Sequence, residues 1–473
     1  MLLIFFIISA VLSLIILFAK NNLLTKSLTP IYLISVVAIS IYSYFHLNQT
    51  DTVYYQFDAL GVLLTAVLGL LSIPTFYHSY LYLKRNNFTA KQEAVYYASL
   101  MMFITAMISS YFAENVALLW VSVESTTLFI SILIYFKRTN DALEATWKYL
   151  FVSSVGLAIA FIGILFLSII ASDNGLNSLS FNDLTSLASN MNTTWLKIAF
   201  VLMVTGFSVK ISVFPLFAVA IDAKTIAASP INALMSTALV NVGFVGIYRT
   251  YIIISKTEIL PWAQHILMLI AVVSIFLAAI QLTRVKRLKR MYAFSSMEHM
   301  GIVLLGLAVG GIGYYAAILH LVFHSLVKAA LFFQIGTIHK FSKSIWIKDM
   351  GSFFKQNPTS SLAFILGIIS ILAIPPSGLF VSELLTFKAL FVNGNYLVAI
   401  TVLIFLTAII FLFVRNAFHI LFNDENIELD KNIKHNPYES ISQFILFGLV
   451  VYLGINPPVF FIDLINSAIA ILN

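Results

Sequence analysis

The chain contains no cysteine, and charged residues make up only 10% of its 473 positions. Without cysteine the chain can have no disulfide bonds, thiolate metal sites or cysteine-held iron–sulfur clusters. Scarce charge together with a hydrophobic content of 60% is incompatible with a soluble domain. The sequence therefore predicts an integral membrane protein.

The net charge of +7 is modest and is expected to orient the chain in a membrane rather than to bind nucleic acid. The first twenty residues, MLLIFFIISAVLSLIILFAK, lack a basic start and a small-residue cleavage site. They are predicted to form a first membrane helix rather than a signal peptide.

Apolar stretches long enough to cross a bilayer recur along the chain and predict an all-α protein with about 14 transmembrane helices. The predicted spans are residues 1–19, 28–48, 59–83, 94–112, 116–136, 146–171, 196–219, 230–253, 262–283, 291–309, 312–338, 359–391, 396–421 and 440–470. In the longest loop, SFNDLTSLASNM is expected to form a short interfacial helix or no fixed structure. The segment NDENIELDKNIKHNPYE is expected to be a solvated surface loop.

Cations collect in the loops that follow odd-numbered predicted helices, whereas carboxylates prevail in the others. The first group includes Lys84, Arg85, Lys137, Arg138, Lys224, Lys286, Arg287, Lys431 and Lys434, and the second includes Asp51, Asp58, Glu114, Asp173 and Asp183. By the positive-inside rule, both termini are predicted on the non-cytoplasmic side of the cell inner membrane.

Two predicted helices are interrupted. Pro215 breaks the seventh, and Pro375 and Pro376 break the twelfth. Broken helices at corresponding positions indicate an inverted-repeat transporter. We expect five-helix repeats, helices 4–8 in residues 94–253 and helices 9–13 in residues 262–421. Residues 1–93 would hold helices 1–3, and residues 422–473 a cytoplasmic loop and the last helix.

Lys210 and Glu124 lie within apolar segments, in GFSVKISVFP and WVSVESTTLF. A charge at the centre of a membrane costs about 3 kcal/mol or more, so such residues usually carry protons or ions. Glu124 is predicted to pair with Lys210, because opposite charges attract strongly at low dielectric. The alternatives are a protonated structural Glu124 and a Lys210 that reaches the interface.

His320, His324 and Lys328 recur at four-residue steps, which places them on one face of a helix. A water-filled face with a proton relay is the expected reading, because histidine exchanges protons near neutral pH. A histidine pair at this spacing also suits zinc, but the sequence shows no third ligand, and no metal is expected.

Three further polar residues are candidates for the same pathway. Asn241 would hold water or make an interhelical hydrogen bond. His299 would join the relay or pack as a satisfied histidine. Glu383, just after the second break, would cap a half-helix and load protons.

The segments VKRLKRMYAFSSMEHMGIVLLG and LHLVFHSLVKAALFFQIG, together with these residues, resemble the proton-conducting antiporter-like family. That family includes the large membrane-arm subunits of respiratory complex I, Mrp antiporter subunits and the membrane subunits of group 4 nickel–iron hydrogenases. The chain is similar above all to the hydrogenase-4 component F type, over residues 95–420. The resemblance implies that Glu124, Lys210, His299, His324, Lys328 and Glu383 form the pathway.

The sequence departs from the family pattern after Pro215. Phe217, Val219, Ile221 and Ile226 stand where the family usually has more polar or rigid residues. This departure affects the expected cytoplasmic entry route and not Lys210.

The leading hypothesis is a proton-translocating membrane subunit of a multisubunit complex, without a cofactor or an enzymatic site of its own. In it, Lys210 passes its proton through Lys328, His324 and His299 toward Glu383. The alternatives are a standalone or Mrp-type sodium/proton antiporter subunit and a proton-coupling subunit for inorganic-carbon uptake. Other membrane subunits, the lipid bilayer and protons or sodium are the expected partners.

Overall fold

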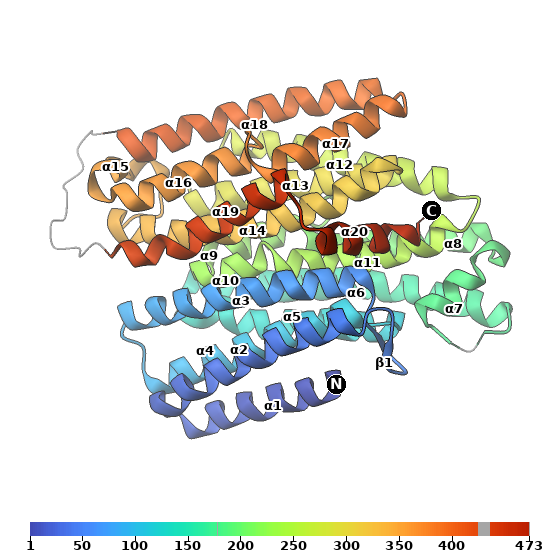
Figure 1. Cartoon of the computed structure of the whole chain (residues 1–473), viewed down its shortest axis with the longest axis horizontal. Coiled ribbons are helices and arrows are strands. Elements are labelled where there is room, and N and C mark those ends of the chain that lie inside the picture. Colours follow the sequence, from blue (N-terminus) through green and yellow to red (C-terminus); the bar gives the residue numbers. More distant parts are fainter. Residues whose placement is uncertain (177, 424–435, 473) are drawn as a thin grey trace. The chain divides into compact units, whose positions relative to one another are not determined.

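The computed structural model describes residues 1–176, 178–423 and 436–472, and these are almost entirely helical (Figure 1). Within them, 13 helices are long and apolar enough to cross a membrane. The predicted twelfth span is present as two shorter helices, α16 (Pro358–Ile371) and α17 (Gly378–Val392). Most of the loop predicted to be solvated, including Lys431 and Lys434, lies outside the described residues.

The contacts divide the chain into two compact units, of which the first comprises Met1–Ala227, Ala238–Ala263 and Phe460–Asn473. Its elements are α1 (Leu2–Ala19), α2 (Asn22–Phe45), β1 (Thr50–Thr52), β2 (Tyr55–Gln56), α3 (Ala59–Arg85), α4 (Ala90–Phe112), α5 (Val116–Ile134), η1 (Tyr135–Lys137), α6 (Asn140–Asp173), α7 (Phe181–Ser186), η2 (Ala188–Asn190), α8 (Thr193–Ile211), α9 (Ala218–Ile226), α11 (Ala238–Ser255) and nearly all of α20 (Val459–Ala470).

The second unit comprises Ala228–Thr237 and Gln264–Val459. Its elements are α10 (Ser229–Met235), most of α12 (Leu260–Leu282), α13 (Leu288–Val309), α14 (Ile312–Ser342), η3 (Ile347–Asp349), α15 (Phe353–Gln356), α16 (Pro358–Ile371), α17 (Gly378–Val392), α18 (Tyr396–Phe422), η4 (Pro437–Ser440) and α19 (Ile441–Ile455). The helices α13 and α14 are buried along nearly their whole length.

Both predicted helix interruptions are confirmed. The helix α8 ends at Ile211, Ser212 adopts a left-handed conformation, and α9 begins beyond Pro215. Pro375 and Pro376 lie between α16 and α17, where the Ser377 side chain accepts a hydrogen bond from the backbone N–H of Leu379. Proline has no backbone donor and disfavours a helical residue before it, so neither helix continues.

One predicted span was wrong in its continuity. Residues 440–470 form α19 and α20, because Pro457 and Pro458 interrupt the apolar run. The predicted span 230–253 lies within one candidate span, Ser229–Ser255, in which a short turn at Ser236 and Thr237 separates α10 from α11. In the seventh span, which was predicted to be interrupted, the first helix ends at Ile211.

The first unit also contains two short helices in a loop and one pair of strands. The predicted loop segment SFNDLTSLASNM forms the short helices α7 and η2. The strands β1 and β2 pair antiparallel, so the fold is nearly rather than wholly helical.

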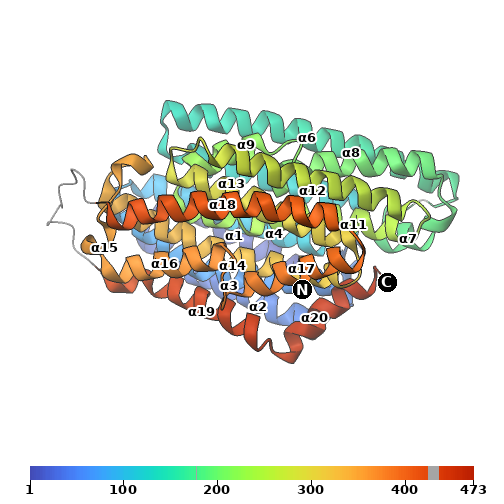
Figure 2. The same cartoon turned by 90° about the horizontal axis from the view of Figure 1, so that it is seen from above.

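Small residues let α6 and α8 approach closely in the first unit (Figure 2). A Cβ atom built on Gly206 would lie 2.5 Å from both the Ala160 Cβ and the Gly156 carbonyl oxygen. Such small-residue contacts stabilise helix pairs in membranes, where there is no hydrophobic driving force between helices. The close approach brings the face of α6 that carries Tyr149 against the end of α8.

Candidate functional site

Lys210 lies in the last turn of α8, beside the interruption, and its side chain is only 2% exposed. Its Nζ donates hydrogen bonds to the Thr127 hydroxyl of α5 at 2.7 Å and to the Tyr149 hydroxyl of α6 at 3.2 Å. The Nζ also lies 5.2 Å from the centre of the Tyr149 ring. Two hydroxyls and an aromatic face therefore replace part of the water that the ammonium loses.

Thr127 connects Lys210 to the carboxylate that the sequence predicted as its partner. The Thr127 hydroxyl donates to Glu124 Oε2 at 3.3 Å, and the Ser154 hydroxyl of α6 donates to Glu124 Oε1 at 2.8 Å. Among the described residues, Lys210 and Glu124 make no direct ion pair. The result is a continuous run of polar groups, from the ammonium through one hydroxyl to a half-buried carboxylate.

The helix α11 closes the other side of Lys210. A Cβ atom built on Gly243 would lie 2.8 Å from the Lys210 Cβ and 2.5 Å from the Ile211 backbone nitrogen. Asn241, two residues earlier, is fully buried and shares a side-chain hydrogen bond with Tyr111 of α4. Asn241 thus makes the interhelical hydrogen bond that was one of its two predicted roles. Its role in holding water stays a prediction.

A second buried lysine lies close by in the same unit. Lys224 of α9 is 1% exposed, and its Nζ donates to the Ser212 hydroxyl at 3.0 Å. Ser212 is the left-handed residue that ends α8, two positions after Lys210. The sequence had assigned Lys224 to a charged loop, because loop composition alone does not show that a short helix folds back and buries it.

In the second unit, Lys328 of α14 is fully buried and donates to the Tyr292 carbonyl oxygen of α13 at 2.7 Å. Its Nζ lies 5.5 Å from the centre of the Tyr292 ring. A carbonyl and an aromatic face thus receive this ammonium, much as a hydroxyl and an aromatic face receive Lys210.

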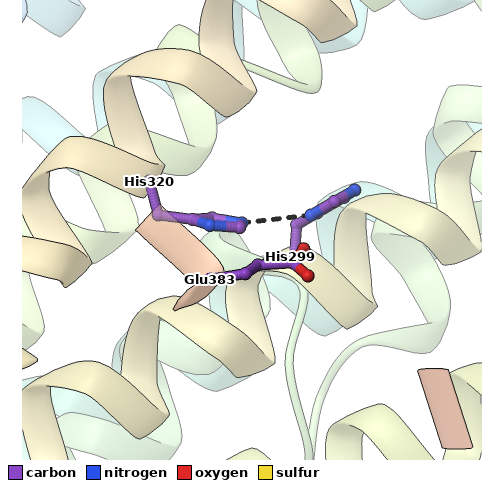
Figure 3. A group of neighbouring side chains, drawn as sticks. All are labelled: His299, His320 and Glu383. Carbon is purple, nitrogen blue, oxygen red and sulfur yellow. Dashed lines mark hydrogen bonds between the residues drawn. The ribbon is translucent and has the colours of Figure 1, made fainter. Parts of the chain in front are cut away.

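Histidines from two helices meet beside the second interruption (Figure 3). His299 Nδ1 of α13 and His320 Nε2 of α14 are 3.0 Å apart, and His320 Nδ1 lies 3.0 Å from the Ser382 hydroxyl of α17. The His324 ring packs against His299, with ring centres 5.4 Å apart. Three helices therefore build one buried cluster.

Two carboxylates flank this cluster. Glu298 Oε2 lies 3.5 Å from His299 Nε2, and Glu298 is 3% exposed. Glu383 of α17 is half-buried, and its carboxylate lies within 4.8 Å of the ligand nitrogens of His299 and His320. Pro375 and Pro376, which end the preceding helix, are exposed themselves and act through the position of α17.

The structure thus divides the predicted pathway residues between two units. Glu124, Lys210 and Asn241 belong to the first unit, and His299, His320, His324, Lys328 and Glu383 to the second. Within each unit, hydrogen bonds or ring contacts join these residues to buried neighbours. The Lys210–Thr127 and His299–His320 hydrogen bonds join side chains that can exchange a proton in a single step.

Sequence reasoning missed the neutral residues that connect the charged ones. Thr127 was visible as a residue one helical turn after Glu124, and Ser382 as the neighbour of Glu383. Tyr149 and Tyr292 gave no such signal, because tyrosine is common in apolar segments.

A further ionic cluster joins loops of the first unit. Arg249 of α11 donates to Asp58 Oδ2 at 3.0 Å and to the Tyr111 carbonyl oxygen at 2.8 Å, and it lies 3.7 Å from Glu114 Oε2. Glu114 accepts from the Ser180 hydroxyl and from the Asn182 backbone N–H. Burial raises the pKa of Glu114, although Arg249 and the bound N–H oppose the shift.

Comparison with known proteins connects this geometry to a family. Residues 113–411 match the family model described as NADH:quinone oxidoreductase/Mrp antiporter, TM. The chain is 32% identical over 301 residues to a hydrogenase-4 component F homolog of Methylacidiphilum infernorum (isolate V4), a match that covers 63% of each chain. It is 27% identical over 349 residues to hydrogenase-4 component B of Escherichia coli (strain K12), covering 71% of this chain and 51% of that one.

The chain spans about half to two thirds of the length of these curated relatives. Solved structures match over nearly its whole length. A chain of the membrane-bound sulfane sulfur reductase, an archaeal respiratory membrane complex, has a TM-score of 0.87 at 20% identity, covering 100% of this chain and 97% of that one. A chain of the Mrp complex from Dietzia sp. DQ12-45-1b has a TM-score of 0.83 at 16% identity, with the same coverage. These likenesses show a shared fold.

Proposed function

The chain belongs to the NADH:quinone oxidoreductase/Mrp antiporter transmembrane family, and we propose that it translocates protons as one membrane subunit of a larger complex. The observation that carries the proposal is the run from Lys210 through Thr127 to Glu124. It keeps a buried ammonium one hydroxyl away from a half-buried carboxylate. Burying a lysine ammonium costs much free energy, so a buried lysine is expected where its protonation changes during function.

In this proposal, each unit holds one proton-exchanging station. In the first, Lys210 is the group that binds and releases the proton. The Thr127 hydroxyl and, through it, the Glu124 carboxylate stabilise the positive charge of Lys210. In the second, Lys328 and the histidines His299, His320 and His324 lead toward Glu383. The order of transfer, from Lys210 through Lys328 and the histidines to Glu383, is the order proposed from the sequence.

The partners are proposed to be other membrane subunits, because the similar solved chains come from multisubunit membrane assemblies. The similarity to hydrogenase-4 component F favours a hydrogenase-like complex, and any redox catalysis would belong to its other subunits. We place the chain in the inner membrane with both termini on the non-cytoplasmic side, as its loop charges predict. The two five-helix repeats, residues 94–253 and 262–421, are part of the same proposal.

Proton uptake by vesicles that contain the complete assembly tests the second station. Lys328→Ala is expected to lower the uptake by about tenfold or more, as for the loss of a proton-transferring side chain. Lys388→Ala is the matched control, because this lysine of α17 is exposed and should leave uptake unchanged. Equal uptake by both variants would overturn the role of Lys328.

The same vesicles distinguish the coupling ion. Proton uptake that proceeds at the same rate without sodium supports the proposed function. A strict requirement for sodium would replace it by a sodium/proton antiporter subunit. Mass spectrometry of the gently solubilised assembly identifies the companion subunits, and a nickel–iron catalytic subunit among them would support the hydrogenase-like complex.

A further inference from the structure

Three potential metal ligands converge from three helices of the second unit. His299 of α13, His320 of α14 and Glu383 of α17 each offer a ligand atom, and these three atoms lie within 4.8 Å of one another (Figure 3). Between the two imidazoles, His299 Nδ1 and His320 Nε2 are 3.0 Å apart. Both histidines are buried, and Glu383 is half-buried. The histidine pair apparent in the sequence, His320 and His324, is not the pair that meets here.

The outer nitrogen of each imidazole faces an oxygen atom. His320 Nδ1 lies 3.0 Å from the Ser382 hydroxyl, and His299 Nε2 lies 3.5 Å from Glu298 Oε2. Metal-binding histidines usually have a hydrogen-bond partner on the second nitrogen, which fixes the ring and leaves the other lone pair for the metal. Ser382 is such a partner for His320, whereas Glu298 lies near His299 Nε2 without a hydrogen bond to it. The cluster therefore has three potential ligands and also a group, Ser382, that would orient one of them.

We propose that His299, His320 and Glu383 bind a divalent transition-metal ion of the zinc type, and that this ion blocks the second proton station. Two imidazoles and one carboxylate suit Zn²⁺ better than Mg²⁺ or Ca²⁺, which prefer oxygen ligands. Three protein ligands leave a fourth position for water. The inference rests on the proposed function only for the consequence of binding and not for the binding itself.

The rearrangement needed for binding is small. Zinc–nitrogen bonds of about 2.0–2.1 Å place tetrahedral ligands about 3.4 Å apart, so side-chain shifts of roughly 1 Å close the site. Both imidazoles would bind in the neutral form, with the single N–H of each on the nitrogen that faces Ser382 or Glu298. The proton that the two rings share in their hydrogen bond moves to the other nitrogen of the ring that carried it, so that both facing lone pairs are free for the ion.

Zinc binding to the purified complete assembly, with Zn²⁺ itself as the probe, tests the site. Equilibrium dialysis with elemental analysis should find one tight zinc in the wild type that is lost in His320→Gln and Glu383→Gln. The matched control is His324→Gln, since this equally buried histidine is one helical turn further along α14 and lies outside the triad. It should keep the zinc. Ser382→Ala should weaken binding by about 10- to 100-fold through the loss of its support for His320.

X-ray absorption at the zinc edge gives a second measurement. It uses the wild type alone and therefore does not depend on whether a variant folds. Two imidazole ligands and one carboxylate are expected in the first coordination shell. Equal zinc content in the wild type, His320→Gln and His324→Gln, or a shell with fewer than two imidazoles, would overturn the site. Proton uptake measured without zinc separates the two ideas: normal uptake in an assembly that binds no zinc contradicts only this inference.

Discussion

The Thr127 hydroxyl accepts a hydrogen bond from the Lys210 ammonium at 2.7 Å and donates one to Glu124. It is the nearest hydrogen-bond acceptor of the ammonium, and it connects Lys210 to Glu124. The charge of Lys210 is therefore connected to the carboxylate through a neutral group that can both give and take a proton.

Replacing Thr127 by valine should interrupt this connection. The variant keeps the shape of the side chain but leaves the ammonium without its nearest acceptor, an unmet hydrogen bond that costs about 1–3 kcal/mol. We expect proton uptake by vesicles to fall about tenfold or more, and Thr127→Ser to restore most of it. The control is Thr407→Val in α18, which should have no effect, because this exposed hydroxyl donates to the Leu403 carbonyl oxygen of its own helix. Full uptake by Thr127→Val would show that the bridge is dispensable.

The Tyr149 hydroxyl should matter less than that of Thr127. Tyr149→Phe removes a longer hydrogen bond, of 3.2 Å, but keeps the ring that lies 5.2 Å from the ammonium. We therefore expect a measurable drop in uptake that is smaller than for Thr127→Val. Tyr32→Phe serves as the control, because the hydroxyl of this buried tyrosine is also hydrogen-bonded, but to Met101 and Thr105 rather than to Lys210. A similar loss of uptake in both variants would point to stability rather than to Lys210.

Gly243 should tolerate no side chain. Gly243→Ala would place a Cβ atom 2.8 Å from the Lys210 Cβ, so α11 and α8 must separate. Overpacking of this kind typically costs about 1–3 kcal/mol. We expect a lower unfolding temperature in detergent together with reduced proton uptake. Gly448→Ala is the matched control, because a Cβ atom there meets nothing within 4 Å. An unchanged unfolding temperature for Gly243→Ala would contradict the close contact.

The raised pKa of Glu114 predicts a pH dependence of stability. Because the folded state binds this proton more tightly than the unfolded state, the contribution of Glu114 is complete below the unfolded pKa. It is lost as the pH rises through the raised folded pKa. Glu114→Gln, which stays neutral, should show a flatter curve of unfolding temperature against pH. Parallel curves for the two proteins would refute the shift.

The class of fold and the charged candidates for the pathway could be predicted from the sequence. A charged residue within an apolar segment is costly in a membrane, so its presence there is informative by itself. The interruptions at Pro215 and at Pro375 were predictable for a similar reason, since proline acts on its own backbone. The division of residues 440–470 into α19 and α20 could have been predicted from Pro457 and Pro458, but the long apolar run concealed it.

The connections between charged residues could not be predicted in the same way. That Thr127 and Tyr149 both reach Lys210 depends on how closely α5, α6 and α8 pack, and this depends on small residues such as Gly206. The burial of Lys224 depends on the direction of the chain after Ser212. Such contacts join residues that are distant in the sequence, and they leave no periodic pattern in the sequence around either residue.

Proton uptake by vesicles of the complete complex that carries Lys210→Ala tests the central claim most directly. If Lys210 binds and releases the transported proton, uptake should fall at least about tenfold while the assembly stays intact, as judged by its subunit composition. Uptake equal to that of the wild type, in an intact assembly, would contradict the account.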